Sequence, residues 1–311
     1  MIRSLRIAFL GNDRWSVPSL RAIADSAHEV VAVMTAARRP AGRGNELRAT
    51  PVADAAAEAG LSLHEVETVT SGPGADALAA SAPDLLIVVA YGEILPQGVL
   101  DLPAIAPVNL HFSLLPKLRG ASPVQTALLE GRDETGVTTI VMDAGIDTGP
   151  VILRRAEAIE RGDDAGSLGD RLAAIGAEVL VETADLFAEG AADPRPQDEA
   201  AATYTRRLGA EDRVLRWSEP ARDLVNRTRA MSPDPGATTR FRGQDLKILR
   251  AEAVPAAGAP GSIVDAGSEG FVIATGEDGF RAIELAPAGR RRMSWSDFLN
   301  GYRPVIGESL G

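Results

Sequence analysis

The first half of this 311-residue chain alternates short apolar runs with stretches of helical character. Residues 5–10, 30–35 and 85–89 have the pattern of strands, and residues 17–27 and 52–59 have the pattern of helices between them. Strands that are apolar on both faces, as these are, are typical of a parallel sheet covered by helices. The sequence therefore predicts an α/β fold with a Rossmann-like parallel sheet.

Changes in pattern along the chain predict the domain boundaries. A helix over residues 165–188 closes a first domain, which we place at residues 1–188. Residues 189–205 are rich in Pro, Gly, Asp and Ala without apolar periodicity, which indicates an extended linker. In residues 206–311, short strand-like runs lie between Gly and Asp, a pattern typical of a small β-barrel.

Composition narrows the class of protein. The chain has no cysteine, and its three histidines are scattered, which excludes disulfides and argues against a metal site. No apolar run approaches the ~18 residues of a membrane span, and no charged segment followed by an apolar one opens the chain. We expect a cytoplasmic, monomeric enzyme that does not contact a membrane.

The turn after the first predicted strand argues against a dinucleotide cofactor. It reads Gly11-Asn12-Asp13-Arg14-Trp15-Ser16 and lacks the G-x-G-x-x-G pattern that brings a pyrophosphate to a helix N-terminus.

Three polar side chains stand at the ends of two later apolar runs. Asn109 and His111 are two residues apart at the end of one run, so on a strand both leave the same face. Asp147 lies in a Gly-Ile-Asp-Thr-Gly turn that closes the second run, residues 137–142. If the two runs are neighbouring strands, an amide, an imidazole and a carboxylate meet at one edge of the sheet.

This trio suits acyl transfer to an amine without a covalent enzyme intermediate. Asn109 would donate to the oxyanion of the tetrahedral intermediate, a contact typically worth about 3–4 kcal/mol. His111 would share that stabilisation or relay the amine proton, and Asp147 would fix the imidazole tautomer and raise its basicity. The chain has no G-x-S-x-G motif, so direct attack by the substrate is the simpler hypothesis.

The motifs resemble those of the formyltransferases that use 10-formyltetrahydrofolate, most closely the branch that acts on methionyl-tRNA. The resemblance rests on N-x-H-x-S-L-L-P, R-G-A-x-P and G-x-D-T-G, and on segments 6–11, 39–44, 90–96 and 298–304. It implies a C-terminal OB-like barrel and a catalytic trio of Asn109, His111 and Asp147. It also implies a folate site, to which we assign Tyr91, Gly92, Ser113, Leu114, Leu115 and Pro116.

Charge is distributed unevenly between the two parts. Residues 1–200 hold 16 Lys and Arg against 29 Asp and Glu, whereas residues 201–311 hold 16 against 14. Arginines gather early in the second part, and Arg290, Arg291 and Arg292 form a short run. Arginines on one face would track RNA phosphates, and the alternative is a solvated charged surface.

A second basic segment, residues 38–48, contains Arg38, Arg39 and Arg43 around two glycines. Flexible basic loops can become ordered on RNA, and the alternative is a surface loop. The resemblance implies that this loop enters the acceptor stem of the initiator tRNA, and Arg43 is then the first candidate for a discriminating contact.

The sequence therefore predicts transfer of a formyl group from 10-formyltetrahydrofolate to the α-amine of methionine on initiator tRNA, with no metal. One alternative is a folate-dependent enzyme that formylates a small amine, such as an amino sugar or glycinamide ribonucleotide. Another is an RNA-binding protein without catalysis.

Overall fold

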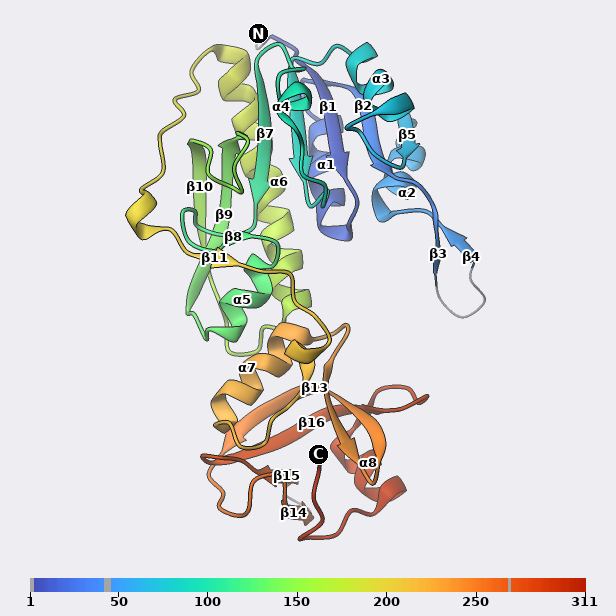
Figure 1. Ribbon diagram of the computed structural model, residues 1–311, viewed down its shortest axis with the longest axis vertical. Coiled ribbons are helices and arrows are strands. Elements are labelled where there is room, and N and C mark those ends of the chain that lie inside the picture. The colour runs from blue at the N-terminus through green and yellow to red at the C-terminus, as the bar shows by residue number, and fades with distance from the viewer. Residues whose placement is uncertain (1–2, 42–45, 268–269) are drawn as a thin grey trace. The chain divides into compact units, whose positions relative to one another are not determined.

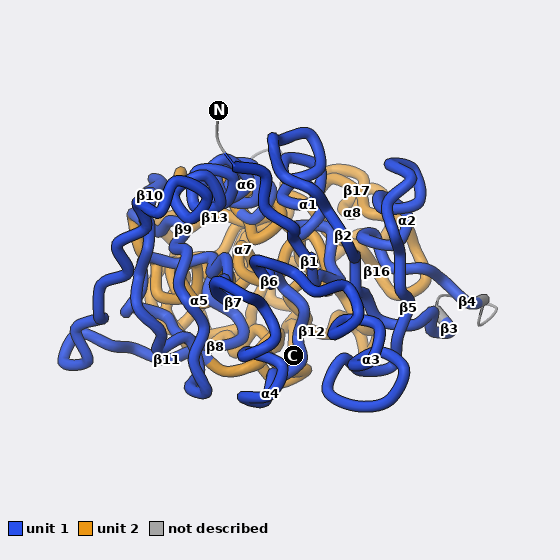
Figure 2. The backbone as a smooth tube through the Cα atoms, turned by 90° about the horizontal axis from the view of Figure 1, so that it is seen from above, with its two compact units in different colours: residues 1–123, 134–158, 169–205 blue, residues 124–133, 159–168, 206–311 orange. Residues whose placement is uncertain are grey.

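The structure is a computed structural model that describes residues 3–41, 46–267 and 270–311. The chain divides into two compact units (Figure 2). The first unit holds residues 1–123, 134–158 and 169–205, and the second holds residues 124–133, 159–168 and 206–311.

A seven-stranded sheet forms the centre of the first unit (Figure 1). Five strands run parallel, and β9 and β10 run antiparallel to their neighbours. The predicted α/β fold with a parallel-dominated sheet is confirmed. In spatial order the strands are β10 (Val151–Ala158), β9 (Glu134–Val141), β7 (Ala106–His111), β6 (Leu85–Val89), β1 (Arg6–Gly11), β2 (Glu29–Ala36) and β5 (Leu63–Val66).

The prediction that the sheet is parallel does not hold for the pairings of β9 and β10. For β9, the reason lies in the connection that precedes it. A parallel neighbour requires a crossover that packs on the sheet, usually through a helix. The helix between β7 and β9 is α5 (Pro123–Leu129), and residues 124–133 belong to the second unit. The chain therefore returns to the sheet without crossing it, and β9 pairs antiparallel with β7.

One helix of the first unit, α2 (Pro51–Glu58), begins at residues suited to a helix start. Thr50 accepts a hydrogen bond from the backbone N–H of Ala53 at 3.0 Å, and Pro51 occupies the first helical position. The other helices of the sheet layer are η1 (Arg14–Ser16), α1 (Val17–Ala24), α3 (Gly72–Ala80), α4 (Gln97–Leu100) and α6 (Ala165–Glu189).

Two small pairings lie outside the large sheet. One is the hairpin of β3 (Arg39–Ala41) and β4 (Glu46–Arg48), and the other joins β8 (Arg119–Gly120) to β11 (Tyr204–Thr205). The second pairing, together with η2 (Glu199–Ala201), places much of the predicted linker on the first unit.

An antiparallel sheet forms the second unit, together with η3 (Glu211–Arg213), α7 (Ala221–Met231) and α8 (Trp295–Tyr302). Its strands, in spatial order, are β12 (Ala237–Phe241), β13 (Gln244–Val254), β16 (Gly279–Pro287), β15 (Gly270–Ala274) and β14 (Ile263–Gly267), and β17 (Met293–Ser294) pairs with β16.

The last residues of the chain connect the two edges of this sheet. Leu310 forms a bridge with Phe241 on β12, and Ser309 forms one with Ser262 just before β14. Edge strands expose unpaired backbone groups, and such pairing covers them. The C-terminal residues thus give the sheet the closed character expected of a barrel.

Phe298 is the residue that packs α8 onto this sheet. Its side chain is buried, and its ring lies 5.3 Å from that of Phe271 and 4.7 Å from that of Tyr302. We expect Phe298→Ala to lower the free energy of unfolding by about 3–5 kcal/mol, because it empties a packed aromatic site. Urea unfolding measures this, with Ile306→Ala as the control. Ile306 is 67% exposed, and its truncation should change stability by no more than about 0.5 kcal/mol.

Candidate functional site

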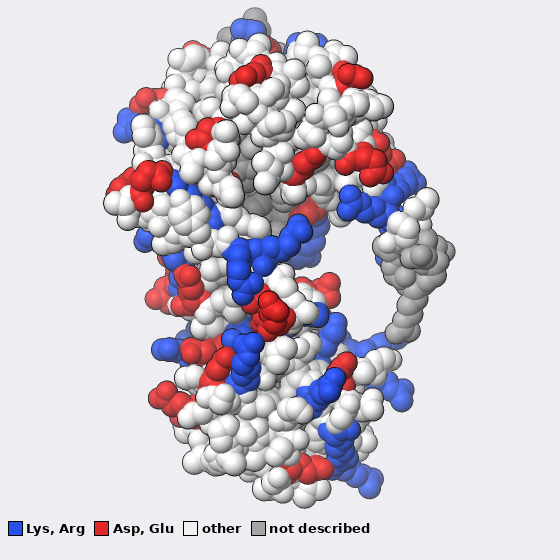
Figure 3. Space-filling model, in the orientation of Figure 1, with Lys and Arg blue, Asp and Glu red and all other residues white. Residues whose placement is uncertain are grey.

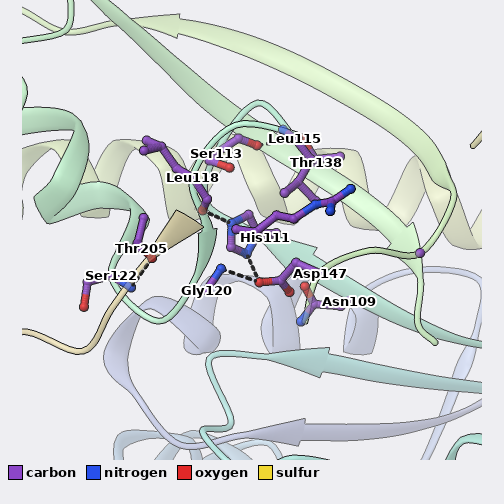
Figure 4. A network of polar contacts seen from close by, with 12 residues as sticks. Asn109, His111, Ser113, Leu115, Leu118, Gly120, Ser122, Thr138, Asp147 and Thr205 are labelled. Carbon is purple, nitrogen blue, oxygen red and sulfur yellow. Dashed lines mark hydrogen bonds and ion pairs between the residues drawn. The ribbon is translucent and has the colours of Figure 1, made fainter. Parts of the chain in front are cut away.

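Asn109 and His111 project from the end of β7 on the side opposite α6. Leu110 between them faces α6, where a side chain at Gly176 would collide with it. Because side chains alternate along a strand, Asn109 and His111 share the other face, as the sequence predicts. Figure 4 shows the Asp147 carboxylate beside both of them.

His111 is buried and has an acceptor at each ring nitrogen. Its Nε2 lies 2.9 Å from the carbonyl oxygen of Leu118, and its Nδ1 lies 3.5 Å from Oδ2 of Asp147. A carbonyl oxygen only accepts, so a proton on Nε2 satisfies this shorter contact, and in the neutral ring with that tautomer Nδ1 presents its lone pair beside Asp147. Leu118 thus contacts the ring more closely than Asp147, to which the sequence analysis assigned the choice of tautomer.

A proton transferred to Nδ1 of His111 would lie next to the Asp147 carboxylate. The imidazolium formed in this way would donate from Nε2 to Leu118 and from Nδ1 to Asp147. Both of these hydrogen bonds stabilise the charged ring. The geometry is therefore that of a proton acceptor supported on both sides.

The loop that carries Asp147 is fixed by its own side chains. Asp143 accepts hydrogen bonds from the Gly145 N–H at 3.0 Å and from the Thr148 hydroxyl at 2.6 Å. A Cβ at Gly149 would lie 1.8 Å from the carbonyl oxygen of Val141, so only glycine fits where the loop rejoins β10. Asp147 has a left-handed backbone with φ of 54°, and its Oδ2 accepts the Gly120 N–H at 2.8 Å.

The side chain of Asn109 makes one hydrogen bond within the described part of the chain. Its Nδ2 donates to the carbonyl oxygen of Val88 at 3.1 Å, and this contact fixes which way the amide points. Among the described residues, its buried Oδ1 has no hydrogen-bond partner. An unpaired buried acceptor costs about 1–3 kcal/mol, so a ligand N–H would be favoured there.

The loop after β7 is bound closely to β9. The Leu115 N–H donates to the Thr138 hydroxyl at 3.2 Å, and that hydroxyl donates to the Ser113 carbonyl at 2.6 Å. The Leu115 side chain is buried with Ile140 and Val151, so it packs in the core. Leu114 also lies against the sheet, at Gly136.

The remaining predicted folate residues, Tyr91 and Gly92, follow β6 in a loop with left-handed backbone at Gly92. Asn12, which the sequence analysis did not select, holds this loop: its Nδ2 donates to the Tyr91 carbonyl, and its Oδ1 accepts the Ala36 N–H at 2.7 Å. One amide thus joins the carboxyl ends of three parallel strands, where ligands of such sheets bind. Burial, and after it the carboxylate of Glu93, raise the pKa of Tyr91 above its usual value.

The predicted RNA-binding arginines have different surroundings. On the first unit Arg38 forms an ion pair with Glu65 at 3.0 Å, Arg39 is exposed on β3, and Arg43 lies outside the described residues. On the second unit Arg292 pairs with Glu284, whereas Arg290 and Arg291 are exposed and have no ion pair within the described part of the chain.

Several other arginines of the second unit belong to its fold. Arg229 donates to the backbone carbonyls of Asp163 and Glu160, both at 2.7 Å, and burial lowers its pKa. Arg227 is largely buried against Glu219. Figure 3 shows basic and acidic side chains interspersed on the face that it presents. The excess of arginine in the sequence therefore overstates the cationic surface that is free to bind a ligand.

Neither a metal cluster nor a membrane span is found in the part of the chain that the structure describes. No group of three or more His, Asp or Glu side chains there could hold a metal ion. Of the helices described, none is long and apolar enough to cross a bilayer.

An amide, an imidazole and a carboxylate in this arrangement suit the transfer of an acyl group to an amine, and comparison with known proteins gives the class of enzyme. Residues 5–184 match the formyl transferase family, and residues 207–303 match the formyl transferase C-terminal domain. The chain belongs to the formyl transferase family and is a transferase.

Relatives within this family share the whole length of the chain. The methionyl-tRNA formyltransferase of Roseiflexus castenholzii is 45% identical over 99% of this chain and 99% of its own. That of Halorhodospira halophila is 44% identical over 98% and 99%, and that of Pelobacter propionicus is 37% identical over 99% and 97%.

Solved structures share the fold. HypX from Aquifex aeolicus in complex with tetrahydrofolic acid has a TM-score of 0.65 at 18% identity; 99% of this chain is covered, but only 49% of HypX. A Helicobacter canadensis N-formyltransferase with folinic acid and dTDP-3-aminofucose has a TM-score of 0.65 at 17% identity, over 91% of this chain and 99% of its own. Methionyl-tRNA formyltransferase from Clostridium thermocellum has a TM-score of 0.56 at 15% identity, over 80% and 94%.

Gly120 links the site to β11 and tolerates no side chain. Its φ is 108°, and a Cβ there would lie 2.5 Å from the carbonyl oxygen of Thr205. We expect Gly120→Ala to lower the free energy of unfolding by about 1–3 kcal/mol through backbone strain and to reduce formyl transfer. Urea unfolding and a transfer assay measure the two effects. Gly98→Ala is the control, since nothing lies within 4 Å of a Cβ there; full stability in both variants would contradict the prediction.

Proposed function

We propose that this protein transfers the formyl group of 10-formyltetrahydrofolate to the α-amine of methionine esterified to initiator tRNA. The observation that carries the proposal is His111 held between the Leu118 carbonyl and the Asp147 carboxylate, beside Asn109. The relatives that share the full length of the chain and bear this name support the choice of substrate.

The chemistry requires one bond to form and one to break. The amine nitrogen attacks the formyl carbon, and the carbon then separates from N10 of the folate. Asn109 has a second amide proton besides the one given to Val88, and this proton stabilises the oxyanion of the intermediate. His111 and Asp147 together take the proton from the amine, and N10 receives a proton as it leaves.

The unpaired Oδ1 of Asn109 adds a role that the sequence analysis did not include. An amine N–H would give this oxygen the partner that it lacks. The same amide would then orient the amine lone pair and polarise the formyl group, which holds both reactants in an attacking geometry.

We assign the folate to the loops that follow β6 and β7. Tyr91 and Gly92 lie in the first, and Ser113, Leu114, Leu115 and Pro116 lie in the second. Because Leu115 packs in the core, the second loop contributes chiefly through its backbone and its fixed shape. The HypX and Helicobacter canadensis structures, which have this fold, hold tetrahydrofolic acid and folinic acid.

We assign the tRNA to Arg38, Arg39 and Arg43 on the first unit and to Arg290, Arg291 and Arg292 on the second. Exposed arginines neutralise phosphates and give binding that weakens with salt. Because the substrate is a charged tRNA, we expect the reaction to take place in the cytoplasm.

His111→Ala and Asp147→Asn test the proposed proton acceptor. Removal of a general base typically costs about 10²–10⁴-fold, so we expect kcat to fall in that range in both variants while tRNA affinity is retained. Steady-state formylation of methionyl-initiator tRNA measures kcat, and filter binding measures affinity. His64→Ala is the matched control, because His64 lies on β5 at the far edge of the sheet.

The same assay distinguishes the alternative functions. Full turnover by His111→Ala would remove the imidazole from the mechanism. Formylation of a dTDP-amino sugar or glycinamide ribonucleotide, with none of methionyl-tRNA, would establish the small-amine alternative. Binding of tRNA without any formyl transfer would favour an RNA-binding protein without catalysis.

Arg290→Ala/Arg291→Ala tests the RNA surface of the second unit. We expect weaker tRNA binding and a slope of log K against log salt that falls by about one for each phosphate that is no longer neutralised. Filter binding from low to moderate salt measures this slope. Arg240→Ala serves as the control, because Arg240 is exposed but paired with Asp245. An unchanged slope in the double variant would remove this run from the interface.

A further inference from the structure

Residues 195–205, which we call the clasp, follow the edge of the candidate site on the first unit. The clasp begins at Arg195, which exchanges two backbone hydrogen bonds of 2.8 Å with Val151 on β10. It ends at Thr205, in the β11 pairing with β8. Between these points it contacts Leu118 and Asp147, the polar partners that the described residues give to the His111 ring.

Those two residues, Leu118 and Asp147, have left-handed backbones with φ of 60° and 54°. Such a conformation is unfavourable for residues other than glycine and persists where neighbouring groups hold it. The clasp contacts both. The hydroxyl of Thr203 accepts the Leu118 N–H at 2.8 Å, and the side chain of Gln197 donates to the carbonyls of Asp147 at 2.8 Å and Gly149 at 2.7 Å.

Arg119 determines which way the Gln197 amide points. Its guanidinium is fully buried and donates to Oε1 of Gln197 from Nε at 3.2 Å and from Nη2 at 2.9 Å. A guanidinium only donates, so it requires the amide oxygen on its side and leaves Nε2 to face the two carbonyls. The partners of the Gln197 amide oxygen and of its amide nitrogen therefore favour the same orientation of the side chain.

The clasp supplies the remaining partners of this buried arginine. Arg119 also donates to both carboxylate oxygens of Glu199, at 2.6 and 2.9 Å, and to the Tyr204 hydroxyl at 3.1 Å. The guanidinium thus holds three side chains of one segment, and through Gln197 it reaches the backbone of Asp147.

We propose that Gln197, oriented by Arg119, is a positioning residue that keeps the Asp147 carboxylate on His111 during formyl transfer. This inference rests on the proposed role of the His111 and Asp147 pair. Neither Gln197 nor Arg119 contacts the reacting atoms in this assignment. Their effect comes from holding the 147–149 backbone, and misplacement of a reacting group by about 1 Å can cost 10²-fold in rate.

Gln197→Glu is the sharpest test, because it conserves size. One carboxylate oxygen still accepts from Arg119, so the clasp stays attached, but the other oxygen faces two carbonyls that require donors. We expect kcat to fall about 10²-fold with KM for both substrates nearly unchanged, and the melting temperature to fall because the two carbonyls lose their donor. A kcat within about twofold of the unmodified enzyme would overturn the proposal.

The pH profile of Gln197→Glu gives a readout that a purely structural role would not produce. A protonated carboxyl donates one hydrogen bond to the carbonyls of the 147–149 turn, and an ionised one donates none. The ratio of its kcat to that of the unmodified enzyme should therefore rise as pH falls. A low ratio of the two kcat values that does not change with pH would overturn the proposal.

Arg119→Met tests the orienting role. Without the guanidinium the Gln197 amide can rotate, so kcat of this variant should fall. The kcat of the double variant Arg119→Met/Gln197→Glu should be no lower than that of Gln197→Glu alone, because both substitutions act through one contact. Full additivity would overturn the assignment to Arg119. Asp198→Asn is the matched control: Asp198 neighbours Gln197 but is exposed, and asparagine keeps the oxygen that accepts the Ala200 N–H at 3.0 Å, so kcat should not change.

Asp147→Asn, measured alongside, separates this inference from the proposed function. An inactive Asp147→Asn with a fully active Gln197→Glu would overturn the positioning role alone. A fully active Asp147→Asn would overturn the proposed catalytic pair itself.

Discussion

The contact on which the site depends is that of His111 with the carbonyl oxygen of Leu118. A proton on Nε2 satisfies this contact, and in that tautomer Nδ1 presents a lone pair beside the Asp147 carboxylate. This arrangement strains the backbone, because Leu118 and Asp147 both adopt left-handed conformations. Each such conformation typically destabilises the folded state by about 1–3 kcal/mol. The surrounding hydrogen bonds of Thr203, Gly120 and Gln197 hold these conformations.

Sheet topology explains why these groups meet. Strand β9 runs antiparallel to β7, so Thr138 lies opposite His111 and Val141 lies opposite Val108. The loop after β9 must therefore return along β7 to bring Asp147 to the ring. The Asp143 side chain and Gly149 give the loop this course. On the other side of β7, the parallel strands bring Asn12 and Tyr91 to the same edge of the sheet.

The second unit shows how far charge in a sequence differs from charge available at a surface. Arg206, Arg227 and Arg242 are paired with carboxylates, and Arg229 is bound to backbone carbonyls. A largely buried arginine such as Arg227 gains little from a phosphate, because it would first have to leave its partner, whereas an exposed ion pair contributes little and can be exchanged. The exposed run at Arg290 and Arg291 is therefore the stronger candidate for a contact with RNA.

The sequence by itself determined the α/β class, the C-terminal β unit and the trio of Asn109, His111 and Asp147, because apolar periodicity and the spacing of polar groups are local properties. Tertiary structure decided the antiparallel course of β9, the contact of His111 with the Leu118 carbonyl and the burial of Leu115. It also decided the partners of Asn12, Arg119 and Gln197, which no spacing predicts. These features depend on which distant backbone groups come within hydrogen-bond distance, and only the folded chain brings residues such as 119, 147 and 197 together.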